Sequence, residues 1–149
     1  MKKLITYNVQ LIKEESKLYN IDNIGINSPS DCSNIIKTVL DLESSAVEKF
    51  GILCLDTKNN VRGIHIISVG TLNSSLVHPR EVFQRAILNN SNSIILFHNH
   101  PSGDPTPSSE DITMTKRIDE AGKILGISVL DHVITGDSRY VSLKERGIL

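Results

Sequence analysis

The chain has 149 residues with 16 Lys or Arg and 17 Asp or Glu, so its formal net charge is −1 at pH 7. This length suits one compact domain, which buries enough surface to fold without a disulfide or a structural metal. The nearly balanced charge excludes a whole-molecule field that would draw the protein onto nucleic acid or acidic lipid.

The start of the chain and its cysteines indicate a soluble, cytoplasmic protein. The first residues, MKKLITYNVQLIKEE, carry the lysines of a signal peptide, but Asn8, Gln10 and Lys13 interrupt any apolar core of such a peptide. No run approaches the roughly 18 apolar residues that a membrane-spanning helix needs. Cys32 lies in a helical pattern and Cys54 in a strand pattern, so we expect two reduced core residues.

Residues 1–28 are expected to form an N-terminal arm, and residues 29–149 a single domain. Within the arm, apolar and polar residues alternate over 4–12, which predicts a strand. The polar residues after it predict a loop.

A helix and a hairpin are predicted next. Ser28 is the expected N-cap of the helix, with Pro29 at its first position and Asp31 three residues past the cap. Two strands follow, at about 49–56 and 61–69, around a turn of Lys and Asn residues.

The second half of the chain alternates helices and strands. Pro79 begins a helix, and the continuously apolar residues 93–98 predict a central strand that is buried on both faces. After a proline-rich loop, a third helix ends at Gly126, a strand is expected within 127–136, and a short one within 139–149. This order predicts an α/β or α+β layered domain, with a central mixed sheet flanked by helices.

The stretch FHNHPSGDPTPSSED, residues 97–111, gathers side chains that can bind a metal. His98 and His100 point to the same side of the predicted strand, because side chains in a strand repeat every two residues. The prolines turn the chain back, and a helix that begins at Ser108 can return Asp111 to the histidines. Two imidazoles and a carboxylate would leave the fourth position of a zinc ion open, as in catalytic sites.

Other interpretations of these residues remain open. Ser108 and Asp111 also match a helix capping box, with Asp in place of the usual Glu or Gln. Asp104 is an alternative ligand in the middle of the turn, and Asn99 is expected to face away from the histidines. His132 fits equally a satisfied core histidine and a residue that supports the site from behind or faces the substrate.

The pattern HNHPSG, followed by PS and an Asp three residues after that Ser, resembles the RadC family of JAB/MPN-type (JAMM) domains over about residues 30–149. The segments VHPREVF upstream and LDHVITG downstream strengthen this resemblance. It implies a layered domain similar to the cytidine-deaminase architecture, in a short form without the helix-hairpin-helix module of longer members. It also implies His98, His100 and Asp111 as zinc ligands, and Ser108 as the donor to an oxyanion.

The same resemblance implies an upstream glutamate that acts as general base. Glu48, at the start of the first hairpin strand, is the best match, and Glu43 and Glu81 are the competitors. Glu81 falls in the first turn of a helix, where its charge suits the helix dipole without a catalytic task. With zinc lowering the pKa of water, Glu48 would pass a proton from that water to the leaving amine. Ser108 would donate a hydrogen bond to the negative oxygen of the intermediate.

The resemblance therefore implies a zinc-dependent metallopeptidase that cleaves peptide or isopeptide bonds in a peptide or protein substrate. The sequence gives no strong signal for a nucleic-acid partner and none for a membrane, and it leaves the natural substrate and the oligomeric state open.

Two other functions compete with this one. The first is a non-catalytic interaction module, since many MPN-type domains have lost their metal ligands. The second is an accessory role in DNA repair or on a mobile element, of the RadC type. The complete motif favours catalysis. A zinc deaminase is excluded, because that class needs a Cys-x-x-Cys that this chain lacks.

Overall fold

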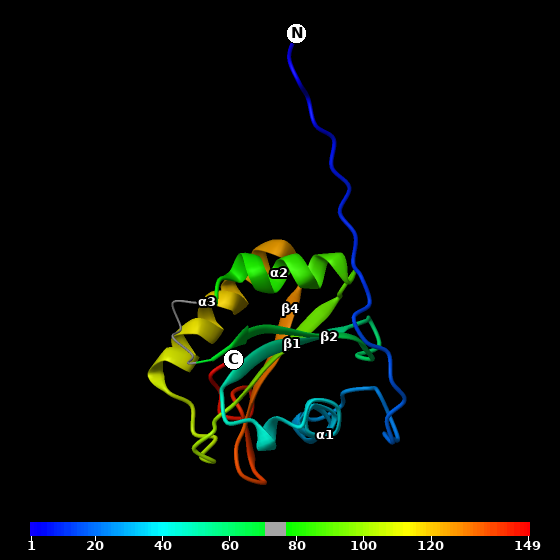
Figure 1. Cartoon of the computed structure of the whole chain (residues 1–149). Helices are drawn as coiled ribbons and strands as arrows, with labels where there is room; N and C mark the ends of the chain where they lie inside the picture. The colour runs from blue at the N-terminus through cyan, green and yellow to red at the C-terminus, as the bar shows by residue number, and fades with distance from the viewer. Residues whose placement is uncertain (71–76) are drawn as a thin grey trace.

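A computed structural model describes residues 1–70 and 77–149, whose strands form one mixed five-stranded sheet. Helices lie on both faces of this sheet (Figure 1). The sheet has the order β2-β1-β3-β4-β5. β1 runs antiparallel to β2 and to β3, β3 runs parallel to β4, and β4 runs antiparallel to β5. The strands are β1 (Lys49–Leu55), β2 (Val61–Val69), β3 (Ser93–Asn99), β4 (Ser128–Thr135) and β5 (Tyr140–Ser142).

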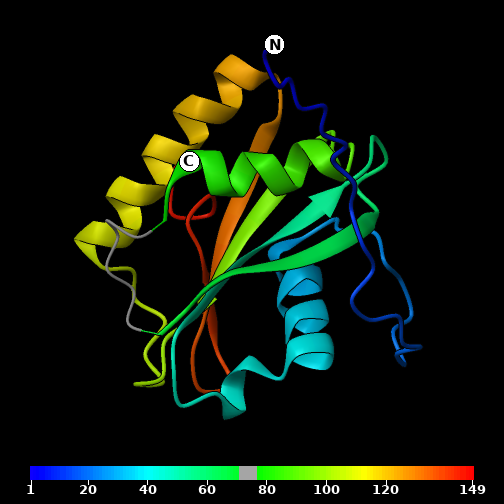
Figure 2. The ribbon, with the colours of Figure 1, turned by 45° about the horizontal axis from the view of Figure 1, so that its top comes forward.

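The helices form a layer on each face of the sheet, as Figure 2 shows. α2 and α3 cover one face, where their apolar residues pack on β1, β3 and β4, and α1 covers the other. This arrangement confirms the predicted layered α+β fold with a central mixed sheet. The helices of the described chain are α1 (Pro29–Leu40), the short 3-10 helix η1 (Leu42–Ser44), α2 (Pro79–Leu88) and α3 (Ser109–Leu125).

The ends of α1 and α3 follow the local signals in the sequence. Ser28 caps α1, and its hydroxyl accepts a hydrogen bond from the Asp31 N–H while the Asp31 carboxylate accepts from the Ser28 N–H. α3 ends at Gly126, whose φ of 73° lies in the left-handed region that glycine adopts without strain. The helices and strands predicted after residue 27 are confirmed.

The central strand β3 is buried along its whole length, as its apolar sequence predicts. Ile94 and Leu96 belong to the core under α2 and α3, whereas Ile95 and Phe97 belong to the core under α1. His98 comes two residues after Leu96, so its side chain lies on the same face of the sheet and points towards α3.

The two cysteines lie in different cores. Cys32 packs in the core under α1 and Cys54 in the core under α2 and α3, so the sheet separates them and both are free thiols. Burial raises the pKa of each thiol, so neither is a reactive thiolate. This placement confirms that both are unpaired core residues.

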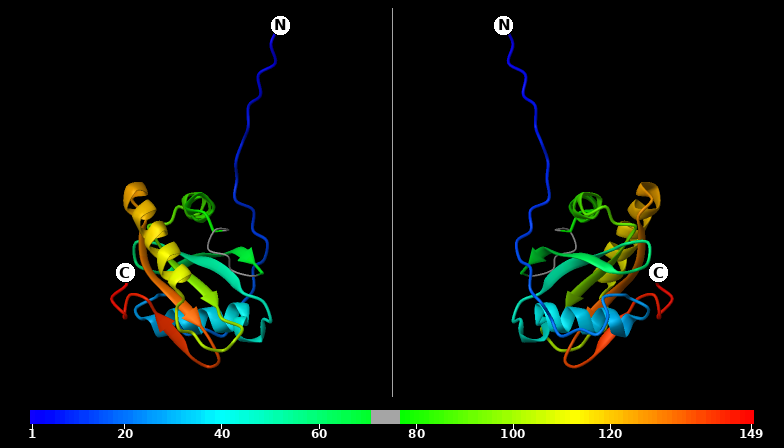
Figure 3. Two further views of the ribbon diagram at one scale, coloured as in Figure 1. Left: turned by 90° about the vertical axis from the view of Figure 1, so that its left-hand side faces the viewer. Right: turned by 90° about the vertical axis from the view of Figure 1, so that its right-hand side faces the viewer.

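The N-terminal arm differs from its prediction. Residues 4–12 form no strand, and Figure 3 shows the arm running away from the body of the domain. Every residue of this segment is exposed, so its alternating pattern buries no apolar face that could offset the entropy of ordering. The arm joins the fold towards its end, where Ile21 packs against the core under α1 and Gly25 pairs with Asn60 at the β1–β2 turn.

None of the helices in residues 1–70 and 77–149 combines the length and the apolar character that crossing a bilayer requires.

Gly51, in the middle of β1, tests how tightly the sheet is packed. A methyl group at this position would overlap the backbone oxygen of His65 and the ring of Phe97. We expect Gly51→Ala to lower the free energy of unfolding by about 1–3 kcal/mol, the usual cost of overpacking a core. Urea denaturation measures this loss. Ile52→Val, which only removes a methyl group from the same strand, should cost about 0.5–1.5 kcal/mol. Wild-type stability of Gly51→Ala would contradict the packing described.

Candidate metal centre

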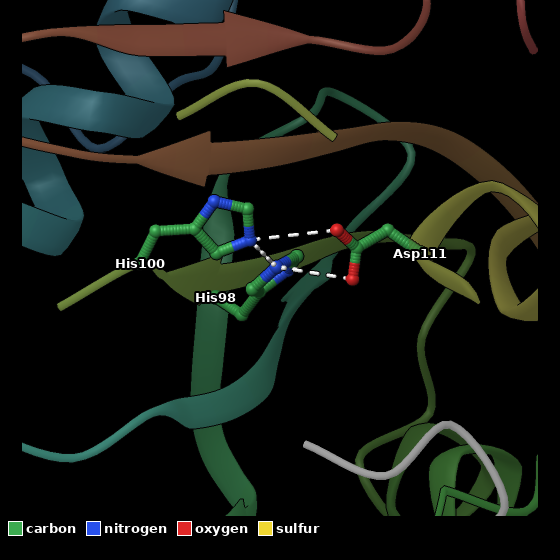
Figure 4. Close-up of side chains that lie close together, drawn as sticks. All are labelled: His98, His100 and Asp111. Atoms are coloured by element: carbon green, nitrogen blue, oxygen red, sulfur yellow. Dashed lines mark hydrogen bonds and ion pairs between the residues drawn. The ribbon is translucent and has the colours of Figure 1, made fainter. Parts of the chain in front are cut away.

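Three side chains converge beside the end of β3, and they form what we call the candidate metal centre: His98, His100 and Asp111 (Figure 4). The Nε2 atoms of His98 and His100 are 2.9 Å apart. The carboxylate of Asp111 spans both rings, with Oδ1 3.4 Å from Nε2 of His98 and Oδ2 3.4 Å from Nε2 of His100. The two imidazoles and the carboxylate predicted from the sequence therefore meet at one place.

The two histidines are held by the strand and by the loop after it. His98 is fully buried, whereas the side chain of His100 is 14% exposed and is the more open side of the centre. The Nδ1 of His100 donates a hydrogen bond to the backbone oxygen of Asp104, 2.7 Å away. The proton of a neutral His100 thus lies on Nδ1, and the lone pair of Nε2 faces Asp111.

The capping box of α3 aims the carboxylate of Asp111. The Ser108 N–H donates to Oδ2 of Asp111 at 2.8 Å, and the Ser108 hydroxyl accepts from the Asp111 N–H at 3.1 Å. The capping interpretation of this pair is correct, and the capped carboxylate is also the one that faces both histidines. One interaction therefore begins the helix and positions the third candidate ligand.

Electrostatics favour a positive charge at this place. Burial alone would raise the pKa of Asp111, but a protonated His100 or His98 would donate from Nε2 to its carboxylate, and this interaction holds the pKa of Asp111 well below its usual range. A charged His100 would carry a second proton on Nε2 and donate it to Asp111, and this hydrogen bond is the main cause that raises the pKa of His100. Asp111 is thus an anion that faces two imidazole nitrogens.

The spacing and the donor types fit a zinc ion. In a tetrahedral site with bonds of about 2.0–2.1 Å, neighbouring ligand atoms lie roughly 3.3–3.4 Å apart. Both distances from Asp111 to the histidines are 3.4 Å, and the distance between the imidazole nitrogens is somewhat shorter, 2.9 Å. A zinc ion held by three protein donors of this kind would keep a fourth position for solvent or substrate, as in catalytic zinc sites.

Glu48 lies near this centre. It is half-buried and immediately precedes β1, in which Phe50 pairs with His98 of β3. Extending this antiparallel register by two residues carries Glu48 towards His100. The pKa of His100 is raised mainly by Asp111, and the negative charge of Glu48 raises it further. The structure therefore places Glu48 beside the centre, and its role as general base stays a prediction.

The competing acids have other partners or other tasks. The carboxylate of Glu43 forms an ion pair with Lys37 at 3.1 Å, and Glu81 lies in the first turn of α2. The carboxylate of Asp104 accepts hydrogen bonds from the hydroxyl and the N–H of Thr106. Asp104 thus reaches the centre through its backbone oxygen and not as a ligand.

A small pocket of about 110 Å³ lies next to the centre, between the loop after β3 and η1. Its lining includes His100, Glu43 and Asp137 but neither His98 nor Asp111. This volume is well below the roughly 300–1,000 Å³ of pockets that enclose a ligand, so the pocket does not enclose a peptide.

His132 of β4 lies directly behind His98. The ring of His132 is fully buried, and its Nε2 is 2.8 Å from Nδ1 of His98, while its Nδ1 is 2.6 Å from the hydroxyl of Thr115. Burial holds the pKa of His132 well below its usual range. His132 is therefore a core histidine with a partner at each ring nitrogen, and it contacts the candidate ligand His98, while its role at the site stays a prediction.

Asn99 holds the segment that carries Glu48. Its Oδ1 accepts a hydrogen bond from the Lys49 N–H at 2.7 Å, and its Nδ2 donates to the oxygens of Val47 at 3.1 Å and Leu42 at 3.3 Å. The Val47 oxygen and the Lys49 N–H flank Glu48, so one side-chain amide fixes the backbone on both sides of it. The sequence predicts that Asn99 faces away from the histidines, and this is correct, but its contacts were not foreseen.

Two sequence signals could have found these supporting residues. Thr115 stands four residues after Asp111, a spacing that places both on one face of a helix. Asn99 is a polar residue in a strand that is buried on both faces, where a hydrogen-bonding partner is required.

Comparison with known proteins identifies the family. Residues 26–148 match the family of the RadC-like JAB domain. The chain is 62% identical over 124 residues to a UPF0758 protein of Desulfitobacterium hafniense, and this match covers 83% of the chain and 54% of the relative. It is 49% identical over 151 residues to a UPF0758 protein of Clostridium botulinum, and this match covers 97% of the chain and 65% of the relative. It is 52% identical over 141 residues to one of Alkaliphilus oremlandii, covering 95% and 60%.

The chain thus spans about half to two thirds of the length of these curated relatives.

Replacing Asn99 tests its hold on the segment around Glu48. We expect Asn99→Ala to lower the free energy of unfolding by about 1–3 kcal/mol, because buried backbone groups lose their partners. Urea denaturation measures this change, and hydrogen exchange should show a less protected Lys49 amide. Asn34→Ala, on the exposed side of α1, is the control and should change stability little. Equal protection of Lys49 in Asn99→Ala and in the wild type would rule out this hold.

The match over residues 26–148 and the high identity to several relatives show that the chain belongs to the RadC-like JAB domain family.

Proposed function

We propose that this RadC-like JAB domain is a zinc-dependent hydrolase that cleaves peptide or isopeptide amide bonds. The observation that carries the proposal is the convergence of His98, His100 and Asp111 at distances suited to one tetrahedral ion. The position of Glu48 next to His100 supports a hydrolytic role, because a base is needed beside the ion.

The residues of the chain divide the work of such a reaction. His98, His100 and Asp111 would hold the ion, and zinc, when bound, supplies the Lewis acidity that makes water a usable nucleophile near neutral pH. Glu48 would accept a proton from the attacking water and deliver it to the leaving amine. Ser108, exposed at the start of α3, would donate a hydrogen bond to the carbonyl oxygen as it becomes negative.

We propose a peptide or protein as the substrate. The pocket beside His100 is too small for a peptide, so a substrate would lie along the surface and present one amide bond to the more exposed side of the centre. We also propose a cytoplasmic location, since free and buried cysteines suit a reducing compartment.

Two other functions are weaker. A non-catalytic interaction module does not need two imidazoles, a carboxylate and a nearby glutamate in this arrangement. An accessory role in DNA repair or on a mobile element would concern the longer relatives, and the formal charge of −1 gives no support for binding duplex DNA through this chain alone.

The ligand set can be tested by metal content. We expect purified wild-type protein to bind one zinc per chain, as measured by elemental analysis. Asp111→Ala should weaken zinc binding by more than the roughly 10–100-fold typical of losing an outer partner of a ligand. Asp104→Ala is the control and should keep its zinc, because its carboxylate contacts Thr106 instead. Full zinc in Asp111→Ala, with loss in Asp104→Ala, would mean that the third ligand is misassigned.

The role of Glu48 can be separated from metal binding. Glu48→Gln keeps the size of the side chain but cannot accept a proton, so zinc should stay bound while hydrolysis slows by about 10²–10⁴-fold. Turnover is measured on a library of peptides that contains both α-linked amides and lysine isopeptides. Glu81→Gln, in the first turn of α2, is the matched control and should leave turnover unchanged. Loss of zinc from Glu48→Gln would assign Glu48 as a ligand instead of the base.

A further inference from the structure

A buried row of hydrogen bonds runs behind His98, on the side away from the candidate metal centre. Nδ1 of His98 meets Nε2 of His132 at 2.8 Å, and Nδ1 of His132 meets Oγ1 of Thr115 at 2.6 Å. The Thr115 hydroxyl then donates to the backbone oxygen of Asp111, also at 2.6 Å. His98, His132 and Thr115 are all 0% exposed, so water does not compete for these bonds.

The direction of every bond in this row is set at its far end. The backbone oxygen of Asp111 has no proton, so the single hydroxyl proton of Thr115 must lie between these two oxygens. The Thr115 oxygen can then only accept from His132. His132 therefore carries a proton on Nδ1.

The same reasoning determines the protonation of His98. Neither ring nitrogen of His132 contacts a carboxylate, since one faces Thr115 and the other faces His98, and a fully buried ring without an anion at either nitrogen is neutral. A neutral His132 with its proton on Nδ1 offers only a lone pair at Nε2. His98 must donate to it from Nδ1, and in a neutral His98 this leaves the lone pair of its own Nε2 facing His100 and Asp111.

The opposite direction would block the centre. If the proton of His132 lay on Nε2, it would point at Nδ1 of His98 and force the proton of a neutral His98 onto Nε2. That proton would point into the centre, where a metal ligand needs a lone pair. The hydroxyl of Thr115 makes this tautomer unfavourable, because it would face Nδ1 of His132 with its oxygen while its proton is engaged with Asp111.

We infer that Thr115 and His132 are positioning residues that fix His98, before any ion arrives, in the tautomer that binds a metal. The inference deepens the proposed function and rests on it only in that the centre takes a divalent cation. The row begins at His98 and ends at the backbone of Asp111, so it connects two of the three candidate ligands. It is assembled from three elements: β3 supplies His98, β4 supplies His132 and α3 supplies Thr115.

Two variants of Thr115 test this inference with zinc ions alone as the probe. Thr115→Val keeps the shape of the side chain but removes the hydroxyl, whereas Thr115→Ser keeps the hydroxyl. Zinc affinity, measured by competition with a chromogenic chelator, should fall by about 10–100-fold in Thr115→Val, the usual effect of losing a partner behind a ligand. Thr115→Ser should restore affinity close to that of the wild type.

The tautomers can be read directly in zinc-free protein. Long-range proton–nitrogen NMR spectra of the imidazoles should show His98 and His132 protonated on Nδ1 in the wild type and in Thr115→Ser. Thr115→Val should lose this single pattern. Equal spectra and equal zinc affinity in the wild type and in Thr115→Val would overturn the inference.

A control separates positioning from general stability. Ser142→Ala removes another buried hydroxyl, which donates to Asp131 at 2.6 Å. Asp131 also accepts a hydrogen bond from the His132 N–H, so this variant disturbs the backbone of His132 without removing a partner of its ring. It should lower the melting temperature without changing zinc affinity, and an equal loss of affinity in Ser142→Ala and Thr115→Val would reject a positioning role. Absence of peptide hydrolysis by the wild type would count against the proposed function only, since the NMR and zinc measurements need no substrate.

Discussion

The end of β3 is the constraint on which the rest of the structure depends. Because this strand is buried on both faces, its two-residue repeat assigns each side chain to one of two cores. The side chains of His98 and His100 lie on the face that α3 covers. The side chain of Asn99 lies on the opposite face, towards α1, and binds the segment before β1. Three consecutive residues thus position two candidate ligands and the backbone around the candidate base.

Much of this arrangement could be predicted from the sequence, because its signals are local. The repeat of two places His98 and His100 together, and the cap formed by Ser108 and Asp111 fixes the helix that returns the carboxylate. Family resemblance added Glu48, which no spacing argument reaches, since it is 50 residues away from His98 in the sequence and the sheet register brings the two strands together. The prediction for residues 4–12 failed because alternation describes an apolar face but not whether a partner covers it.

The contacts that support the centre were harder to predict, and the reason is physical. Thr115, His132 and Asn99 act through hydrogen bonds between elements that are distant in the sequence, and the direction of such bonds depends on the full set of donors and acceptors. Helical spacing puts Thr115 on the same side as Asp111, yet only the position of β4 shows that a histidine lies against it. A pattern in one strand or helix cannot carry that information.

The same network explains how three acceptors can face one another. The proton of His100 is directed outward to the oxygen of Asp104, and that of His98 outward to His132, so both imidazoles turn lone pairs inward, towards an anionic carboxylate. Lone pairs and a negative charge repel one another in a buried place, and a cation between them converts that repulsion into attraction. The fold holds these groups in place through a buried strand, a helix cap and a row of hydrogen bonds, none of which includes the ion itself. A site arranged in this way is prepared for a divalent metal before the metal arrives, which lowers the reorganisation that binding would otherwise require.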